Sequence, residues 1–130
     1  MIERALLGIE DMEGLLSHPV VGASWEGFVL ENLLAAAPEG SAAYYYRSSG
    51  GAEIDLLIGM PGSGLWAIEI KRSTAPSPTR GFHEACADVN PQRRIVVYPG
   101  AERFPLSKDV EAVPLQTLAQ ELADAKRKQP

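Results

Sequence analysis

The chain has 130 residues, of which 45% are hydrophobic and 22% charged, and this size and mixture are typical of a single soluble globular domain. Its net charge of −5 argues against tight nonspecific binding to nucleic acid, which depends on Lys and Arg, but leaves room for a locally basic groove. A single cysteine, Cys86, excludes an internal disulfide and makes the cytoplasm the expected compartment. No apolar run approaches the length of a membrane span, so we expect no membrane partner.

The two ends of the chain carry the weakest structural signals. Residues 1–17 show a weak helical pattern that is broken just before Pro19, and we expect them to be an N-terminal connecting segment. Residues 126–130 contain the basic run Lys-Arg-Lys, and we expect a disordered, solvated tail there. Residues 18–125 between them are the predicted domain.

The first strong helix is predicted over residues 23–36. Ser24 is the predicted N-cap, since its hydroxyl can accept a hydrogen bond from the first turn. Apolar side chains recur at helical spacing until Pro38 and Gly40 end the pattern. Because they occupy most of the helix circumference, we expect this helix to be largely buried.

Three strands are predicted next, over residues 44–47, 53–58 and 65–71. A glycine-rich turn over residues 48–51 connects the first two strands, and a loop over residues 59–64 connects the last two. Links this short require antiparallel neighbours, so the three strands are expected to form a meander.

The second half of the chain alternates helix and strand. A helix is predicted over residues 79–88, a β-branched strand over 94–98, a short edge strand over 110–113 and an amphipathic helix over 115–126. The stretch between the third strand and residue 94 has room for a helical crossover, so these two strands are expected to be parallel. The predicted fold class is therefore α/β, with a mixed central sheet flanked by helices.

Charged residues in the second and third strands fall on one side of the strand alternation. Successive side chains of a strand point to opposite faces. If the hairpin keeps its apolar residues on one face, then Asp55, Glu69 and Lys71 lie together on the other. The apolar set consists of Ile54, Leu56, Ile58, Trp66, Ile68 and Ile70.

This cluster of charges is suited to a divalent cation. Two carboxylates at close range repel each other, and a cation between them relieves the repulsion. Mg²⁺ prefers oxygen ligands and is typically held by one or two carboxylates with water and phosphate. Lys71 would then stabilise developing negative charge, and Glu26, on the first helix, projects from an apolar stripe toward the same cluster. The alternative is a solvated salt bridge on an open sheet face.

Glu26, Asp55 and Glu69-Ile70-Lys71, on a helix and two successive strands, resemble the motif of the PD-(D/E)XK nuclease-like superfamily. The closer resemblance, over residues 18–123, is to the DUF4143 domain at the C-terminus of many prokaryotic AAA-type ATPases. It is carried by the stretches GASWEGFV (22–29), YYRSSGGAEID (45–55) and WAIEIK (66–71). The resemblance implies a restriction-endonuclease-like core in which Glu26, Asp55, Glu69 and Lys71 are catalytic. In active members the carboxylates bind Mg²⁺ or Mn²⁺ and the lysine assists phosphodiester hydrolysis.

Two functions stay open at this point. One is a metal-dependent endonuclease acting on DNA or another nucleic acid. Here Arg47 either contacts phosphate or pairs with Glu53, and Arg72 and Arg80 either line a basic rim or are ordinary surface residues. The other is an inactive binding or regulatory module serving an attached ATPase region. No phosphate-binding motif Gly-x-x-x-x-Gly-Lys-Ser/Thr occurs in these 130 residues, so any ATP-coupled activity is expected to lie on other sequence.

Overall fold

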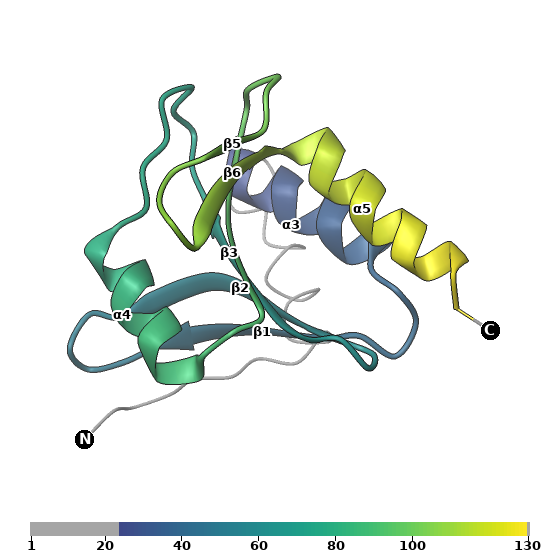
Figure 1. The fold of residues 1–130 in the computed structure, drawn as a ribbon, viewed down its shortest axis with the longest axis horizontal. Coiled ribbons are helices and arrows are strands. Elements are labelled where there is room, and N and C mark those ends of the chain that lie inside the picture. The colour runs from purple at the N-terminus through teal and green to yellow at the C-terminus, as the bar shows by residue number, and fades with distance from the viewer. Residues whose placement is uncertain (1–23, 130) are drawn as a thin grey trace.

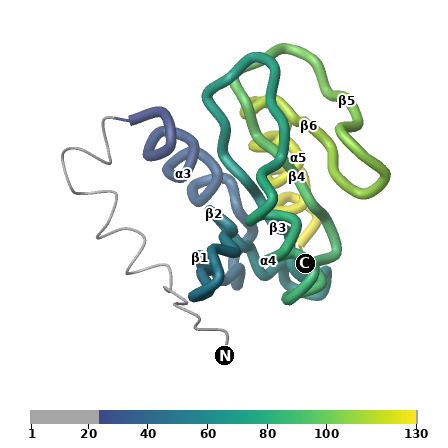
Figure 2. The backbone as a smooth tube through the Cα atoms, turned by 90° about the vertical axis from the view of Figure 1, so that its left-hand side faces the viewer, coloured from purple at the N-terminus to yellow at the C-terminus, as the bar shows by residue number. Residues whose placement is uncertain are grey.

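A six-stranded mixed sheet is the centre of the computed structural model, which describes residues 24–129 (Figure 1). The expected connecting segment over residues 1–17 lies outside the described residues. The sheet order is β1-β2-β3-β4-β6-β5, and in Figure 2 β1 and β5 lie at opposite sides of the sheet. The strands are β1 (Ala42–Arg47), β2 (Glu53–Met60), β3 (Gly64–Ile70), β4 (Arg93–Tyr98), β5 (Phe104–Pro105) and β6 (Val110–Pro114), and the helices are α3 (Trp25–Ala36), α4 (Arg80–Val89) and α5 (Leu115–Arg127).

The expected strand directions are confirmed. β1, β2 and β3 form an antiparallel meander, and β4 pairs parallel to β3 after the α4 crossover. The first turn contains Gly51 at φ 92°, a left-handed backbone conformation that glycine adopts without strain. The second connection is tighter than predicted, because β2 continues to Met60 and β3 begins at Gly64.

The helix ends follow local capping rules. The Ser24 hydroxyl accepts from the Gly27 N–H at 3.0 Å and begins α3, as predicted. Thr79 caps α4 in the same way, and Asn90 ends α4 in the left-handed conformation. α5 extends to Arg127, two residues into the segment expected to be a disordered tail, because the helical hydrogen bonding continues there.

No helix in the described part of the chain is long and apolar enough to cross a membrane.

Each face of the sheet has its own apolar core. α3 and α5 cover one face, where their buried leucines pack on β2, β3, β4 and β6. α4 covers the other face through Phe82, Ala85 and Cys86, which pack on the opposite side chains of the same strands. Figure 1 shows α4 on one side of the sheet and the α3–α5 pair on the other. Both helical layers predicted from the sequence are therefore present.

A bulge in β2 corrects the predicted alternation of faces. Tyr44 pairs with Leu57 and Tyr46 pairs with Ile54, so two residues of β2 between these pairs stand opposite one residue of β1. Ile54 therefore packs in the α4 core, whereas Leu56 packs in the α3–α5 core. The expectation that Ile54 and Leu56 share a face was wrong, because the extra residue reverses the parity at that point.

The far side of the sheet differs from prediction in one respect. β6 was expected to be an edge strand, but β5 pairs antiparallel with it and covers that edge.

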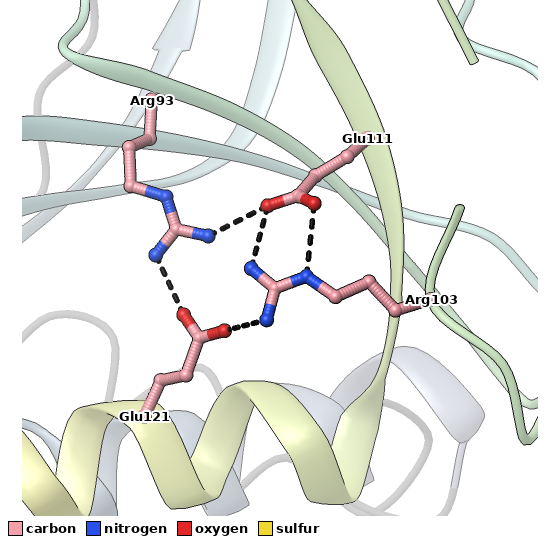
Figure 3. A network of polar contacts seen from close by, with 4 residues as sticks. All are labelled: Arg93, Arg103, Glu111 and Glu121. Atoms are coloured by element: carbon pink, nitrogen blue, oxygen red, sulfur yellow. Dashed lines mark hydrogen bonds and ion pairs between the residues drawn. The ribbon is translucent and has the colours of Figure 1, made fainter. Parts of the chain in front are cut away.

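Four charged residues connect β4, β6, α5 and the start of β5, as Figure 3 shows. Arg93 of β4 donates to Glu111 of β6 at 2.8 Å and to Glu121 of α5 at 2.7 Å. Arg103, just before β5, donates to the same two carboxylates. This network ties the β5 connection to the sheet and to α5.

Candidate functional site

The candidate site lies where β2 and β3 stop pairing. Their register runs from Met60 and Gly64 to Leu56 and Ile68. Beyond it, an Asp55 carboxylate oxygen (Oδ2) accepts a hydrogen bond from the Ile70 main-chain N–H at 2.8 Å. The side chain of Asp55 thus takes the place of a main-chain acceptor in the ladder, and it lies beside the Glu69-Ile70-Lys71 segment.

Glu69 is buried, and both of its carboxylate oxygens accept hydrogen bonds. At 7% exposed, it is the only charged residue classed as buried in the part of the chain that the structure describes. Both carboxylate oxygens bind Thr79: Oε2 accepts from its N–H at 3.0 Å, and Oε1 accepts from its hydroxyl at 2.7 Å. The Lys71 ammonium lies 3.5 Å from Oε1. A buried carboxylate needs such donors, and these hold it at the N-terminus of α4.

Burial raises the pKa of Asp55 from its ordinary value of 3.8 to about 6. The hydrogen bond from Ile70 opposes this rise, while the negative charges of Glu26, Glu69 and Glu53 add to it. The Asp55 carboxyl on β2 therefore feels the negative charges of Glu26 on α3 and Glu69 on β3, in addition to the larger effect of its burial. A cation placed among them would relieve the repulsion that the raised pKa reflects.

Glu26 lies in the first turn of α3 and is exposed, in contrast to Glu69. Its neighbour Trp25 anchors this end of α3 to the site, because the indole N–H donates to the Lys71 carbonyl oxygen at 2.9 Å. The Lys71 N–H in turn donates to the Val97 carbonyl of β4 at 2.9 Å. The main chain of Lys71 is therefore held from both sides, which leaves its side chain to reach Glu69.

The donor set is compatible with Mg²⁺ or Mn²⁺ but is not a closed metal cage. Residues 24–129 contain no group of three or more His, Cys, Asp and Glu side chains placed to hold a metal ion. Asp55 and Glu69 present carboxylate oxygens from neighbouring strands, and Mg²⁺ usually takes one or two carboxylates and completes its shell with water and phosphate. Ligation by Glu26, Asp55 and Glu69 stays a prediction.

The three arginines predicted to contact nucleic acid are separated. Arg47, at the end of β1, pairs with Glu53 at 2.9 Å, which is one of its two expected roles. Arg72 is exposed directly after Lys71. Arg80 is exposed in the first turn of α4 and pairs with Glu84 at 2.9 Å. Of these, only Arg72 adjoins the Glu69–Lys71 segment in sequence.

The sequence interpretation did not include two residues that shape the site. Thr79 was only the first residue of a predicted helix, yet its hydroxyl also accepts from the Phe82 N–H at 3.1 Å and so joins Glu69 to the α4 cap. Its position after Pro78 and before a helical pattern is a capping signal that points to this hydroxyl. The Trp25 contact with Lys71 spans 46 positions and has no local sequence signal.

Comparison with known proteins identifies the family to which the chain belongs. The model of a domain of unknown function, DUF4143, matches residues 21–118. An uncharacterized protein of Mycobacterium bovis and one of Mycobacterium tuberculosis are each 47% identical over 110 residues, which are 84% of this chain and 24% of each relative. The chain thus spans about a quarter of the length of these curated relatives. No solved structure matches significantly. The matched segment contains Glu26, Asp55, Glu69 and Lys71 together.

Proposed function

Because the chain belongs to the DUF4143 family, we propose that it is a PD-(D/E)XK nuclease-like domain with a restriction-endonuclease-like core. Its reaction is the hydrolysis of phosphodiester bonds in DNA or another nucleic acid. The observation that carries the proposal is the meeting of Asp55 with the Glu69–Lys71 segment where β2 and β3 part. The pKa of Asp55 is raised mainly by burial and further by the negative charges of Glu26 and Glu69, and this gathering of carboxylates supports a site for a cation.

Each residue has a chemical role in this proposal. Asp55 and Glu69 would hold Mg²⁺ or Mn²⁺, with Glu26 contributing from α3. When bound, the metal would neutralise phosphate charge and lower the pKa of an attacking water. Lys71 stabilises the negative charge that develops on the phosphate, because its ammonium already lies at the site edge. Thr79 and Ile70 hold the two carboxylates in position through their hydrogen bonds.

The test is cleavage of single- and double-stranded DNA and RNA by the purified protein with Mg²⁺ or Mn²⁺. Lys71→Met and Glu69→Gln should each lower the rate about 100-fold or more, the usual effect of removing a group that stabilises transition-state charge. Lys108→Met removes an exposed lysine between β5 and β6 and should leave the rate unchanged. The nuclease proposal would be contradicted if the wild type cleaves none of these substrates, or if the Lys71→Met variant cleaves as fast as the wild type.

A second candidate is a catalytically inactive module of a longer protein, attached to an AAA-type ATPase region. It is favoured by the two hydrogen bonds from Thr79 to the Glu69 carboxylate, which compete with a metal for its oxygens. The curated relatives also extend well beyond the segment that this chain matches. In this case Glu69→Gln alters stability alone. The discriminating measurement is the ATPase rate of the full-length protein, which should change on deletion of this domain but not with Lys71→Met. An unchanged rate after deletion would count against it.

A further inference from the structure

An aromatic pocket lies beside the candidate site. Phe28 of α3 is 52% exposed and is the only exposed large hydrophobic residue among those described. It stacks on Trp25, with ring centroids 6.0 Å apart and an angle of 29° between the planes. The two rings form one wall of an open cavity of about 510 Å³. Other lining residues include Asn32, Tyr98, Leu115 and Gln116. A volume of this size is within the range that holds small organic groups.

The pocket adjoins the end of the sheet that carries the site. Its floor includes Tyr98 at the end of β4 and Pro114 at the end of β6. β3, β4 and β6 run parallel, so these strand ends and Lys71 belong to the same carboxyl edge, where open α/β sheets bind ligands. The Trp25 indole, bonded to the Lys71 carbonyl at 2.9 Å, connects pocket and site directly.

The pocket is lined by neutral side chains, with neither an acidic nor a basic residue among them, so nothing in it repels a group attached to a phosphate. The chain has 17 acidic residues, yet the residues that line the pocket include no Asp or Glu. The rim is formed by the start of α5, whose first turn has no acidic residue and whose N-cap, Pro114, offers no side-chain hydrogen bond. Asn32 and Gln116 add hydrogen-bonding groups suited to a base edge.

We propose that the aromatic pocket binds an unpaired base of a single-stranded nucleic acid, which stacks on Phe28 while the adjoining backbone passes Lys71. Stacking on aromatic side chains tolerates any base, and Lys71 with the exposed Arg72 supplies positive charge for the phosphate backbone beside the pocket. That the nucleic acid also runs past the candidate site rests on the proposed function. Its binding in the aromatic pocket can be measured without cleavage.

The experiment is equilibrium binding in EDTA, which removes divalent metal. Fluorescently labelled single-stranded DNA, single-stranded RNA and the matching duplex are compared. In a Trp66→Phe background Trp25 is the sole tryptophan, and its quenching reports a base in the pocket. Phe28→Leu keeps an apolar side chain but removes the aromatic ring, and Phe28→Tyr keeps the ring. Because Phe28 is half-exposed, these variants should fold like the wild type.

Single strands should bind more tightly than the duplex and quench Trp25. Phe28→Leu should weaken single-strand binding about 5- to 150-fold, the effect of losing one stacked base, and Phe28→Tyr should restore it. Lys108→Ala controls for the loss of a distant charge and should have little effect. Absence of single-strand binding, or equal binding by Phe28→Leu, would overturn the inference, as would a pocket that takes only apolar protein segments.

The two proposals fail in different ways. If the wild type binds single strands through Phe28 but cleaves none of them with metal, the nuclease proposal fails and the pocket assignment stands. If cleavage occurs and Phe28→Leu cleaves single strands as fast and binds them as tightly as the wild type, the pocket assignment fails alone.

Discussion

Replacing Asp55 with Asn is expected to stabilise the folded protein above about pH 6. Burial raises the pKa of this carboxyl to about 6, with added repulsion from Glu26 and Glu69. Ionised Asp55 therefore destabilises the folded state relative to the unfolded state. Asn has no charge to bury, and its amide oxygen can still accept the hydrogen bond that Ile70 donates at 2.8 Å.

The size of the effect follows from the two pKa values. A shift from 3.8 to about 6, at about 1.4 kcal/mol per pKa unit, amounts to about 3 kcal/mol. Because the folded state binds this proton more tightly than the unfolded state, the Asp55 contribution is most favourable below pH 3.8, where both states are protonated. It declines as the pH rises from about 4 to 6. After an allowance for the partial exposure of Asp55, Asp55→Asn should gain about 2 kcal/mol at pH 8.

The assay is urea unfolding of wild type and Asp55→Asn at several pH values between 4 and 8, followed by circular dichroism. The difference between the two proteins isolates Asp55, because every other titrating group is common to both. That difference should grow in favour of Asn up to about pH 6 and then level off. A difference that does not vary with pH, or an Asn variant that is less stable at pH 8, would refute the electrostatic reasoning.

Three further predictions concern contacts elsewhere in the fold and at the start of α4. Arg103→Met should raise the pKa of Glu111 from about 2 toward 4.5, since the Arg103 hydrogen bonds are the largest cause of its lowering, and NMR titration would measure this. The lowered pKa adds stability that is present above pH 4.5 and lost as the pH falls toward 2, so this variant should lose about 1 kcal/mol at neutral pH in urea unfolding, and an unchanged pKa would contradict the assignment. Thr79→Val should cost about 2 kcal/mol or more of unfolding free energy, because it removes both the α4 cap and a hydrogen bond to the buried Glu69 carboxylate, and Thr79→Ser should recover it; equal stability of the Val and Ser variants would contradict both contacts. Gly81→Ala should lower the thermal midpoint although Ala favours helices, because its Cβ would lie 2.6 Å from the Gly51 carbonyl oxygen, and a raised midpoint would refute the close packing of α4 on that turn.

The elements of the fold were predictable because their signals are local. The Ser24 cap, the helical spacing of α3 and the β-branched run of β4 depend on neighbouring residues alone, and the structure confirms them. The antiparallel meander followed from connections too short for any other pairing. The strand and helix ends moved by one or two residues, which is where hydrogen bonding from the partner element decides the boundary.

From the sequence alone, Asp55 could be assigned to the second strand of a hairpin and Glu69 to the third, with Lys71 at its end, because the short connection leaves few other pairings. The tertiary structure alone decided how they meet. The β2 bulge changed the face of Ile54, and the end of the β2–β3 ladder let Asp55 bond the Ile70 N–H. Thr79 reached Glu69 only because the crossover helix begins against β3. These contacts join residues ten or more positions apart, where no local pattern constrains the chain.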